Sequence, residues 1–588
     1  MKILGISSFF HDSAAALIDG SDVVAAAEEE RFSRIKHDNS FPINSIKFVL
    51  KVANISIHEV DYIVFYEKPI LKLHRILLSN SKNIFKNLDS QFELLRSWDK
   101  NKISTRNFIS NVLGVNKKKI LFFEHHFSHA ASAFYCSGFN SSDLYTSDAV
   151  GEWCTTTYGN TKNKELIRSG RVNFPDSIGL LYTAFTEFLG FEVNEGEYKV
   201  MGMAPYGKPI YQEKIDKLFK KKGLNFELDQ SYFNFNIESG SNLTQKFIEE
   251  FGKKREIGDS FYLENFSEDL STEEIFDKKL INSKSQYFAD IASSLQTYLE
   301  NFTLENIKQI KQENGDENLC YAGGVAYNSA INSKIIRSKI YKNVFIQPAA
   351  GDSGGALGCA LGSSYLLKEK NFNYQNTYLG KGYNHQEIKK CLEFNSIDYN
   401  YYEKDEDLNK ETSKLISNSM VIGWFQGRFE FGPRALGNRS ILADPRYFKN
   451  KKIINSKIKF REIFRPFAPS TLDKYFNEYY EVNSNWRQCD PYRFMLSTVE
   501  VKESFKSKLA AVTHVDGTAR AQLVLKQDNE KFYNLIESFG DLTGIYTLLN
   551  TSFNRKGEPI VNTPQEALNV FLWTDLDALV LGNFLIKK

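Results

Sequence analysis

Apolar and polar residues alternate along this chain in blocks that are typical of an α/β protein. The first block, residues 2–6, is apolar; a polar turn and a second apolar run at residues 14–18 follow, and Asp19-Gly20 then predicts a β-hairpin. Residues 61–66 and 119–123 have the composition of buried strands, and residues 285–313 have the apolar spacing of a helix. This alternation predicts α/β architecture.

Two stretches interrupt the pattern. Residues 211–284 are rich in Lys, Glu, Asn and Phe, and we interpret them as a helical insertion or a peripheral element on the substrate side. Residues 366–384 are polar without a clear period, which is typical of a connector between domains. A new α/β pattern follows, with a helix near residues 384–393 and a strand at residues 420–425. We therefore expect two domains, residues 1–370 and residues 385–588.

Composition narrows the class of protein. The 588 residues carry 74 Lys and Arg against 72 Asp and Glu, a net charge of +2, which disfavours a nucleic-acid partner. The six cysteines are scattered without a CxxC pair, which favours a reducing compartment. We find neither a signal peptide nor a membrane-spanning run. These features predict a cytoplasmic protein with no membrane partner.

Three of the nine histidines lie within five residues, in the string EHHFSHAASAF. The string follows a predicted strand and is rich in Ala, so it should open a helix. His125 and His129 would then share one face, whereas His126 would point elsewhere. Two imidazoles at this spacing can bind a divalent ion if carboxylates complete the shell, and Asp148 and Asp352 are candidates. Such a mixed shell suits iron(II), manganese or zinc better than magnesium. The alternative is that these histidines are ordinary surface or core residues.

Glycine-rich turns follow several predicted strands. The strings GEYKVMGMAPYG, AGGVAYN and QPAAGDSGGA mix glycines with few charges, and the last two lie between a strand and a helix. A turn at a helix start directs backbone N–H groups at an anion such as a phosphate. None of the three strings matches a P-loop or a GxGxxG fingerprint. Several such turns together predict a nucleotide pocket, although each alone could be a simple tight turn.

Basic residues gather in the second half of the sequence, interleaved with glycines, aromatics and prolines. The strings are GWFQGRFEFGPRALGNRSILADPR and KIKFREIFRPFAPS, followed by THVDGTAR and LNTSFN with short polar side chains. Arginines presented by turns can bind phosphate or carboxylate in a bidentate manner. We interpret the region as a phosphate-binding cavity; the alternative is a surface patch for acidic partners.

Taken together, these strings resemble the NodU/CmcH family of O-carbamoyltransferases. Further matching strings are GISSFFHDSAAAL, EEERFSRIKHD, DAVGEW and NRKGEPIV, so that the resemblance runs from residue 5 to about residue 564. It implies an N-terminal Kae1-like domain of the actin and sugar-kinase (ASKHA) fold and a C-terminal YrdC-like domain. The YrdC-like domain would make carbamoyl adenylate from carbamoyl phosphate and ATP with Mg²⁺. The Kae1-like domain would transfer the carbamoyl group to the hydroxyl of a small-molecule natural product or sugar.

The resemblance also implies roles for individual residues. The implied metal, iron(II) or another divalent transition metal, falls on the four residues named above. The catalytic contacts to carbamoyl phosphate and ATP fall on Arg434, Lys459 and Arg465. His11 and Asp12 lie in the first turn, and Asp12 is our candidate general base for the acceptor hydroxyl. The remaining nucleotide contacts are assigned to Lys199, Gly202, Gly323, Gly324, Asn328, Arg428, Arg520, Asn550 and Ser552.

Two departures from the family pattern concern the acceptor rather than the reaction. The family usually has Asp-Gly where this chain has Asp148-Ala149, and Leu where Tyr327 stands. Two other functions remain open: a threonylcarbamoyl-type tRNA-modifying enzyme, and a non-catalytic nucleotide-binding protein on an actin-like scaffold. The acceptor is open, and so is the oligomeric state, with a homodimer among the options.

Overall fold

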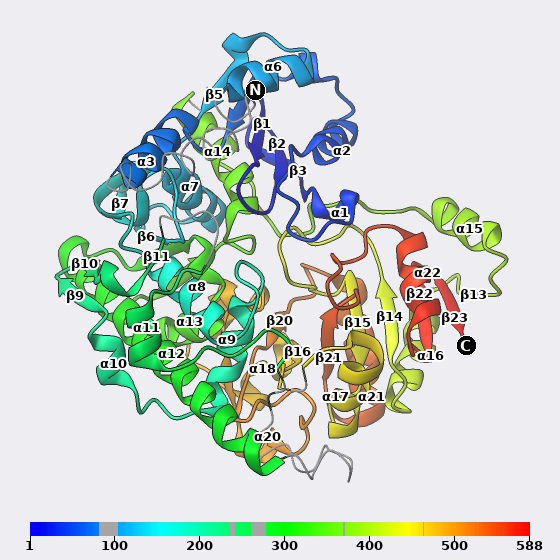
Figure 1. Cartoon of the computed structure of the whole chain (residues 1–588). Coiled ribbons are helices and arrows are strands. Elements are labelled where there is room, and N and C mark those ends of the chain that lie inside the picture. Colours follow the sequence, from blue (N-terminus) through cyan, green and yellow to red (C-terminus); the bar gives the residue numbers. More distant parts are fainter. Residues whose placement is uncertain (82–103, 236–240, 260, 262–277, 368–370, 463) are drawn as a thin grey trace. The chain divides into compact units, whose positions relative to one another are not determined.

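The computed structural model describes residues 1–81, 104–235, 241–259, 261, 278–367, 371–462 and 464–588 (Figure 1). These residues form two compact units, and neither is one continuous stretch of chain. Unit 1 consists of Met1–Ile6, Ser56–Lys342 and Gly358–Asn371, and unit 2 consists of Ser7–Ile55, Asn343–Leu357 and Phe372–Lys588. The last boundary falls in the predicted connector, whereas two earlier segments group with the C-terminal residues. The assignment of functions to two domains remains a prediction.

Unit 1 contains two groups of paired strands. The first is parallel, as expected for α/β chains, and consists of β1 (Lys2–Ser7), β4 (Tyr62–Phe65) and β5 (Ile120–Phe122). In the second, β6 pairs in parallel with β11 and antiparallel with β7, which continues to β8. Its bounds are β6 (Asp143–Ser147), β7 (Cys154–Lys162), β8 (Glu165–Asn173) and β11 (Asn318–Ala322). The predicted strands at residues 61–66 and 119–123 are confirmed.

Helices of unit 1 follow the strands closely in the sequence. The predicted helix at residues 285–313 is confirmed within α12 (Lys278–Asn314). Gly358 of α14 (Asp352–Leu366) lies against the backbone of α7, because a Cβ at Gly358 would come within 1.8 Å of the carbonyl oxygen of Ser128. The other helices are α3 (Pro69–Ser81), α6 (Thr105–Leu113), α7 (His125–Ser137), α8 (Ile178–Phe188), α9 (Glu197–Met203) and α13 (Ser329–Ser338).

The segment at residues 211–284 is not purely helical as expected. Its described part includes an antiparallel hairpin, β9 (Phe219–Lys222) with β10 (Asn225–Leu228). Short helices flank the hairpin, α10 (Gln212–Asp216) and α11 (Gln245–Phe251). The alternation in β10 of exposed Asn225 and Glu227 with buried Phe226 and Leu228 explains the strand, because such alternation buries one face of a hairpin. Residues 236–240, 260 and 262–277 lie outside the described residues.

Unit 2 begins with the hairpin that the sequence predicted. β2 (Ala14–Asp19) pairs antiparallel with β3 (Asp22–Glu28), and Gly20 between them has φ +58°, a conformation that glycine adopts without strain. Two helices follow, α1 (Glu30–Ser33) and α2 (Ile43–Ala53). A separate short segment contributes β12 (Asn343–Ile346) and the first residues of α14.

The C-terminal part of unit 2 contains a sheet of eight strands among its described residues, in the order β13-β23-β22-β14-β15-β21-β16-β20. The predicted helix near residues 384–393 and strand at residues 420–425 correspond to α15 (His385–Phe394) and β14 (Ile422–Phe425). The other strands are β13 (Asn400–Tyr401), β15 (Arg439–Ala443), β16 (Ala468–Leu472), β20 (Gln522–Val524), β21 (Thr547–Ser552), β22 (Ala578–Leu581) and β23 (Phe584–Lys587).

The remaining short elements of unit 2 lie between these strands in the sequence. A small antiparallel sheet has the order β17-β18-β19. Its strands are β17 (Tyr480–Glu481), β18 (Val499–Val501) and β19 (Thr518–Ala519). The helices are α16 (Asp405–Ser417), α17 (Phe448–Ile453), α18 (Asp473–Tyr479), α19 (Asp490–Arg493), α20 (Glu503–Lys506), α21 (Glu530–Thr543) and α22 (Pro564–Trp573).

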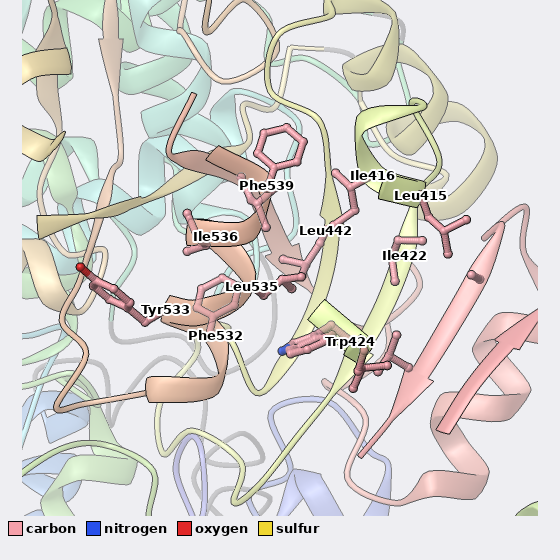
Figure 2. Close-up of a cluster of buried hydrophobic side chains, with 14 of the residues drawn as sticks. Leu415, Ile416, Ile422, Trp424, Leu442, Phe532, Tyr533, Leu535, Ile536 and Phe539 are labelled. Atoms are coloured by element: carbon pink, nitrogen blue, oxygen red, sulfur yellow. The ribbon is translucent and has the colours of Figure 1, made fainter. Parts of the chain in front are cut away.

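The core of the eight-stranded sheet lies under α16 and α21 (Figure 2). Trp424 of β14 and Phe532 of α21 are fully buried there, as are Leu535, Ile536 and Phe539. Burying one such side chain contributes about 1.5–3 kcal/mol. The Trp424 indole donates a hydrogen bond of 2.9 Å to the carbonyl oxygen of Gly437, so its polar atom is satisfied. This core supports the strands from which the basic loops emerge.

Candidate functional site

The histidine cluster opens α7, as the sequence predicted. The carboxylate of Glu152 accepts hydrogen bonds of 3.0 and 3.3 Å from the backbone N–H of His125, and so satisfies a group that the first turn of a helix leaves unpaired. His125 and His129 are buried on one face, with their Nε2 atoms 3.1 Å apart. Glu152 was missed by sequence reasoning, although it lies in the quoted string DAVGEW.

Asp148 completes this group, which we call the His/Asp centre: His125, His129 and Asp148. The residue follows β6, and its Oδ2 lies 2.8 Å from Nε2 of His129 and 3.3 Å from Nε2 of His125. Burial alone would raise the pKa of the Asp148 carboxyl, but the hydrogen bonds from both histidines lower it well below its usual value. The centre therefore holds an ionised carboxylate in a buried place.

The geometry of the His/Asp centre fits a divalent metal ion. Ligands bound at about 2.1 Å in tetrahedral or octahedral geometry lie about 3.0–3.4 Å apart, close to the 2.8–3.3 Å between these atoms. His126 points elsewhere as expected, with Nδ1 2.7 Å from Oγ1 of Thr146 and Nε2 2.9 Å from the carbonyl oxygen of Cys154. Asp352 is the buried first residue of α14 and belongs to unit 2; its role as fourth ligand stays a prediction.

A glycine turn lies directly against the His/Asp centre. Gly323, at the end of β11, has φ +99°, and a Cβ there would come within 2.2 Å of the carbonyl oxygen of Ser147. A Cβ at Gly324 would come within 2.9 Å of Oδ1 of Asp148. Both positions therefore require glycine for close approach. Asn328 caps α13 and exchanges hydrogen bonds of 2.9 and 3.0 Å with Gln296.

The other glycine string of unit 1 is not a turn at the position expected. Gly202 lies inside α9, because the run Tyr198 to Met201 forms helix well enough to offset the cost of one glycine, about 1 kcal/mol. Lys199 of the same helix has its ammonium 5.6 Å from the ring centre of Phe191. The nucleotide-binding roles of Lys199 and Gly202 stay predictions.

The basic residues of unit 2 form a group that we call the cation cluster: Arg434, Lys459, Arg461, Arg465 and Arg520. Lys459 ends the π-helix η7 (Ile454–Lys459) and is buried. Its ammonium donates to Oδ1 of Asn554 at 2.7 Å and to Oγ of Ser552 at 3.1 Å, both neutral acceptors. Burial and repulsion from Arg461 and Arg465 lower the pKa of Lys459 well below its usual value. The predicted contacts Lys459 and Ser552 are thus neighbours.

Arg520 shows the electrostatic character of the cation cluster most clearly. Burial lowers its pKa well below the usual value, and repulsion from Arg434, Arg461 and Arg465 lowers it further. Arg465 has a carboxylate partner, Glu462, at 3.6 Å. An anion such as a phosphate would relieve the repulsion among these cations. Two of the predicted phosphate contacts, Arg434 and Arg465, therefore act electrostatically on a third, Arg520.

Glu430 holds the loop that presents Arg434. Its buried Oε1 accepts hydrogen bonds of 2.8 Å from the backbone N–H groups of Leu436 and Asn438. The side chain of Arg31 donates to the carbonyl oxygen of Gly432 at 2.9 Å from the other side of the loop. Sequence reasoning missed Glu430 and Arg31, because a charged residue inside a motif gives no sign that it bonds the backbone.

Two predicted nucleotide contacts have structural partners. Arg428 donates to the carbonyl oxygens of Leu379, Gly380 and Val24 at 2.6, 2.9 and 3.1 Å, and these contacts favour a bracing role. Asn550 is buried in β21, and its amide donates to the carbonyl oxygen of Ala435, next to Arg434, at 3.1 Å. The assignment of both residues to ATP stays a prediction.

The first turn brings His11 and Asp12 together with a residue that sequence reasoning did not assign. Asp12 Oδ2 lies 2.8 Å from Nδ1 of His11, and its Oδ1 lies 2.8 Å from Nδ1 of His37. The signal that could have found His37 is the string KHD, which was quoted only as part of a resemblance.

Comparison with known proteins decides the family. The profile described as Carbamoyltransferase N-terminus matches residues 2–361, and that described as Carbamoyltransferase C-terminus matches residues 413–588. The chain belongs to the carbamoyltransferase family. It is therefore a carbamoyltransferase of the NodU/CmcH type, and the resemblance drawn from its motifs is confirmed.

Two relatives match this carbamoyltransferase over nearly its whole length, and a third matches less than half of it. The protein sll1178 of Synechocystis sp. is 41% identical and covers 100% of this chain and 96% of its own. The nodulation protein NolNO of Sinorhizobium fredii is 37% identical over 99% of this chain and 80% of its own length. The 3'-hydroxymethylcephem-O-carbamoyltransferase of Streptomyces clavuligerus is 31% identical over 45% of this chain and 48% of its own.

Similarity to solved structures is weak. HypF of T. kodakarensis is 15% identical with a TM-score of 0.32, covering 63% of this carbamoyltransferase and 48% of HypF. The ROK hexokinase of Thermus thermophilus is 12% identical with a TM-score of 0.29, covering 63% and 100%. The mixed α/β class is confirmed by the structure itself, whereas the actin-like and YrdC-like folds stay predictions. No helix within the described ranges is long and apolar enough to span a membrane.

Proposed function

We propose that this carbamoyltransferase makes carbamoyl adenylate from carbamoyl phosphate and ATP at the cation cluster, and then transfers the carbamoyl group to a hydroxyl. ATP would enter with Mg²⁺, and the acceptor would be a small-molecule natural product or a sugar. The N-terminal region, residues 1–370, would perform the transfer, and residues 385–588 would perform the activation. A homodimer is the oligomeric state to test by light scattering.

The observation that carries this proposal is the gathering of cations around Arg520, whose pKa is lowered by burial and further by repulsion from Arg434, Arg461 and Arg465. Folding such charges together is costly unless a multivalent anion joins them. Carbamoyl phosphate and the ATP phosphates are anions of this kind. Lys459 supports the assignment, because its hydrogen bonds go to neutral oxygens of Ser552 and Asn554 and leave its charge to attract a phosphate.

The His/Asp centre would serve the transfer step. His125, His129 and Asp148, with Asp352 as the predicted fourth ligand, would hold iron(II) or another divalent transition metal. A bound ion would supply positive charge to neutralise the phosphate of the adenylate and assist its departure. Gly323 and Gly324 would let the nucleotide approach closely, since their Cβ positions are already filled by backbone and carboxylate atoms. Glu152 would hold the start of α7 and so orient His125.

The test is release of AMP from ATP in the presence and absence of carbamoyl phosphate. We expect release to require carbamoyl phosphate and to be lost in Lys459→Met. Lys457→Met is a matched control from the same helix, because Lys457 is 59% exposed and pairs with Asp575 at 3.5 Å. ATP binding without AMP release would instead indicate a nucleotide-binding protein. AMP release that requires threonine and tRNA would indicate the tRNA-modifying alternative.

A further inference from the structure

Two turns of unit 2 meet at the carboxylate of Asp12. The backbone N–H of Phe9 donates to the carbonyl oxygen of Asn39, and that of Ser13 donates to the carbonyl oxygen of Asp38, both at 2.8 Å. These bonds fix the turn at residues 7–13 against the turn at residues 34–39. Asp12 and His37 have positive φ angles, 41° and 53°, so each side chain leaves its turn in a direction that ordinary backbone would not give.

The hydrogen bonds around Asp12 fix the tautomer of both neighbouring imidazoles. Each carboxylate oxygen lies 2.8 Å from one Nδ1 atom, that of His11 or that of His37. Although burial opposes ionisation, the two histidines hold the pKa of Asp12 well below its usual value, so the carboxylate only accepts hydrogen bonds. Both Nδ1 atoms must therefore donate, and in each neutral ring the lone pair is left on Nε2.

The two rings differ in their remaining contacts. Among the residues that the structure describes, Asp12 is the hydrogen-bond partner of the His37 ring, through Nδ1 alone, and the His37 side chain is 31% exposed. His11 lies with its ring centre 4.8 Å from that of His37. Nε2 of His37 thus belongs to a partly exposed ring, held on a hydrogen-bonded turn and backed by a carboxylate. This is the arrangement of a histidine general base with its orienting acid.

The turn that carries His37 is also anchored near the cation cluster. Arg34 donates to the carbonyl oxygens of Pro559 and Ile560, both at 2.8 Å. Lys36 lies close enough to Lys459 that repulsion between the two ammonium groups lowers the pKa of Lys459 further. Glu30 accepts a hydrogen bond of 2.9 Å from the backbone N–H of His37. The titratable and charged groups on or beside the two turns are Asp12, His11, Glu30, Lys36 and Asp38.

We propose that His37 is a catalytic residue, the general base that takes the proton of the acceptor hydroxyl at Nε2, with Asp12 as its positioning residue. This proposal rests on the proposed function and replaces Asp12 as the base. As the O–H bond breaks, the proton moves to Nε2 and the oxygen forms a bond to the carbamoyl carbon. The bond from that carbon to the phosphate oxygen breaks, and AMP leaves with the electron pair. The imidazolium, stabilised by Asp12, then returns its proton to water.

The experiment separates hydroxyl activation from adenylate formation in the full chain. Hydroxylamine attacks carbamoyl adenylate through an unprotonated nitrogen and needs no base. The product is hydroxyurea, and the amount formed with ATP minus the amount formed without ATP measures carbamoyl adenylate formation. Glycerol and water are the hydroxyl probes. Transfer to glycerol is measured as glyceryl carbamate, and transfer to water is measured as AMP released without hydroxylamine. We expect His37→Asn to retain hydroxyurea formation within about 2-fold and to lose transfer to both hydroxyl probes by about 10²-fold or more.

A pH profile distinguishes a base from a structural residue. The rate of transfer to glycerol by the wild type should rise with pH through one ionisation. This rising part of the pH profile should disappear in His37→Asn and should shift along the pH axis in Asp12→Asn. His58→Asn is the matched control, since His58 is exposed in η1 (Ile57–Glu59). The proposal is overturned if His37→Asn keeps wild-type transfer and the rising part of the pH profile, or if the wild type carbamoylates hydroxylamine but neither hydroxyl probe. A wild type that forms no hydroxyurea would instead refute the proposed function.

Discussion

The His/Asp centre and the cation cluster are both groups of ionisable side chains, but they are held in opposite ways. In the His/Asp centre a carboxylate lies 2.8 and 3.3 Å from two imidazoles, and the hydrogen bonds lower the pKa of Asp148. In the cation cluster, burial lowers the pKa of Arg520, and repulsion from other guanidinium groups lowers it further. In the first group a carboxylate lies among imidazoles, whereas the second gathers like charges whose repulsion a bound anion would reduce.

This difference predicts how each group answers to substitution and to ligand. Removing the carboxylate charge from the His/Asp centre leaves buried polar atoms with weaker hydrogen-bond partners and therefore lowers the stability of the fold. Removing a charge from the cation cluster reduces electrostatic repulsion in the ligand-free protein, so it lowers activity without lowering stability. Stability and activity should therefore change together in the His/Asp centre and in opposite directions in the cation cluster.

The largest effect should be the loss of activity in Arg434→Ala. We expect carbamoyl-phosphate-dependent AMP formation to fall about 10²–10³-fold, because the proposed function places this cation against the phosphate. His125→Ala should lose transfer but keep adenylate formation, followed as hydroxyurea. Arg487→Ala serves as the control, since Arg487 is exposed. Equal loss of the same step in both variants would contradict the division of labour between the two groups.

The next largest effect should be the loss of stability in Asp148→Asn. In the metal-free protein we expect the free energy of unfolding in urea to fall by about 2–3 kcal/mol, because the hydrogen bonds from two buried imidazoles to a charged group are weakened. A chelator should lower the melting temperature of the wild type and leave that of Asp148→Asn unchanged. Asp216→Asn is the exposed control. Unchanged stability together with a retained chelator response would show that Asp148 does not bind the ion.

Acid should destabilise unit 2 through His514. Burial, together with the positive charges of Arg520 and Lys451, lowers the pKa of His514 to about 4. The unfolded chain binds this proton near pH 6.5 and the folded chain only near pH 4, so stability falls as pH falls through this window. We expect a loss of about 2 kcal/mol between pH 7 and pH 4, measured by urea unfolding. The dependence of the free energy of unfolding on pH should be weaker in His514→Gln and unchanged in His58→Gln.

The smallest effect, and the one of opposite sign, should be a gain of stability in Arg520→Met. Without phosphate we expect unfolding to cost about 1 kcal/mol more than in the wild type, because repulsion from three arginines is removed. Added phosphate should raise the melting temperature of the wild type more than that of the variant. A variant that is less stable and responds to phosphate like the wild type would refute the repulsive character of the cluster.

The periodic spacing of apolar and polar residues was enough to predict many of the helices and strands and part of the candidate site. The i, i+4 spacing placed His125 and His129 on one face, since a helix repeats every 3.6 residues. It could not place Glu152, whose bond to the start of α7 spans 27 residues of sequence. Gly202 was misplaced in a turn because the helix-forming run around it offsets a local preference. The hairpin β9–β10 was missed because its strands are short and β9 is mostly lysine.

The sequence alone determined the α/β class, the helix with its paired histidines, the glycine turn at Gly323 and Gly324 and, through its motifs, the carbamoyltransferase family. Local spacing and composition are enough for these, because they depend on residues that are neighbours in the chain. Only the tertiary structure decided that Arg428 braces carbonyl groups while Arg434 and Arg520 repel each other, and that Asp12 orients His37. Those distinctions depend on which backbone and charges surround a side chain, and folding sets that environment by joining segments that are distant in sequence.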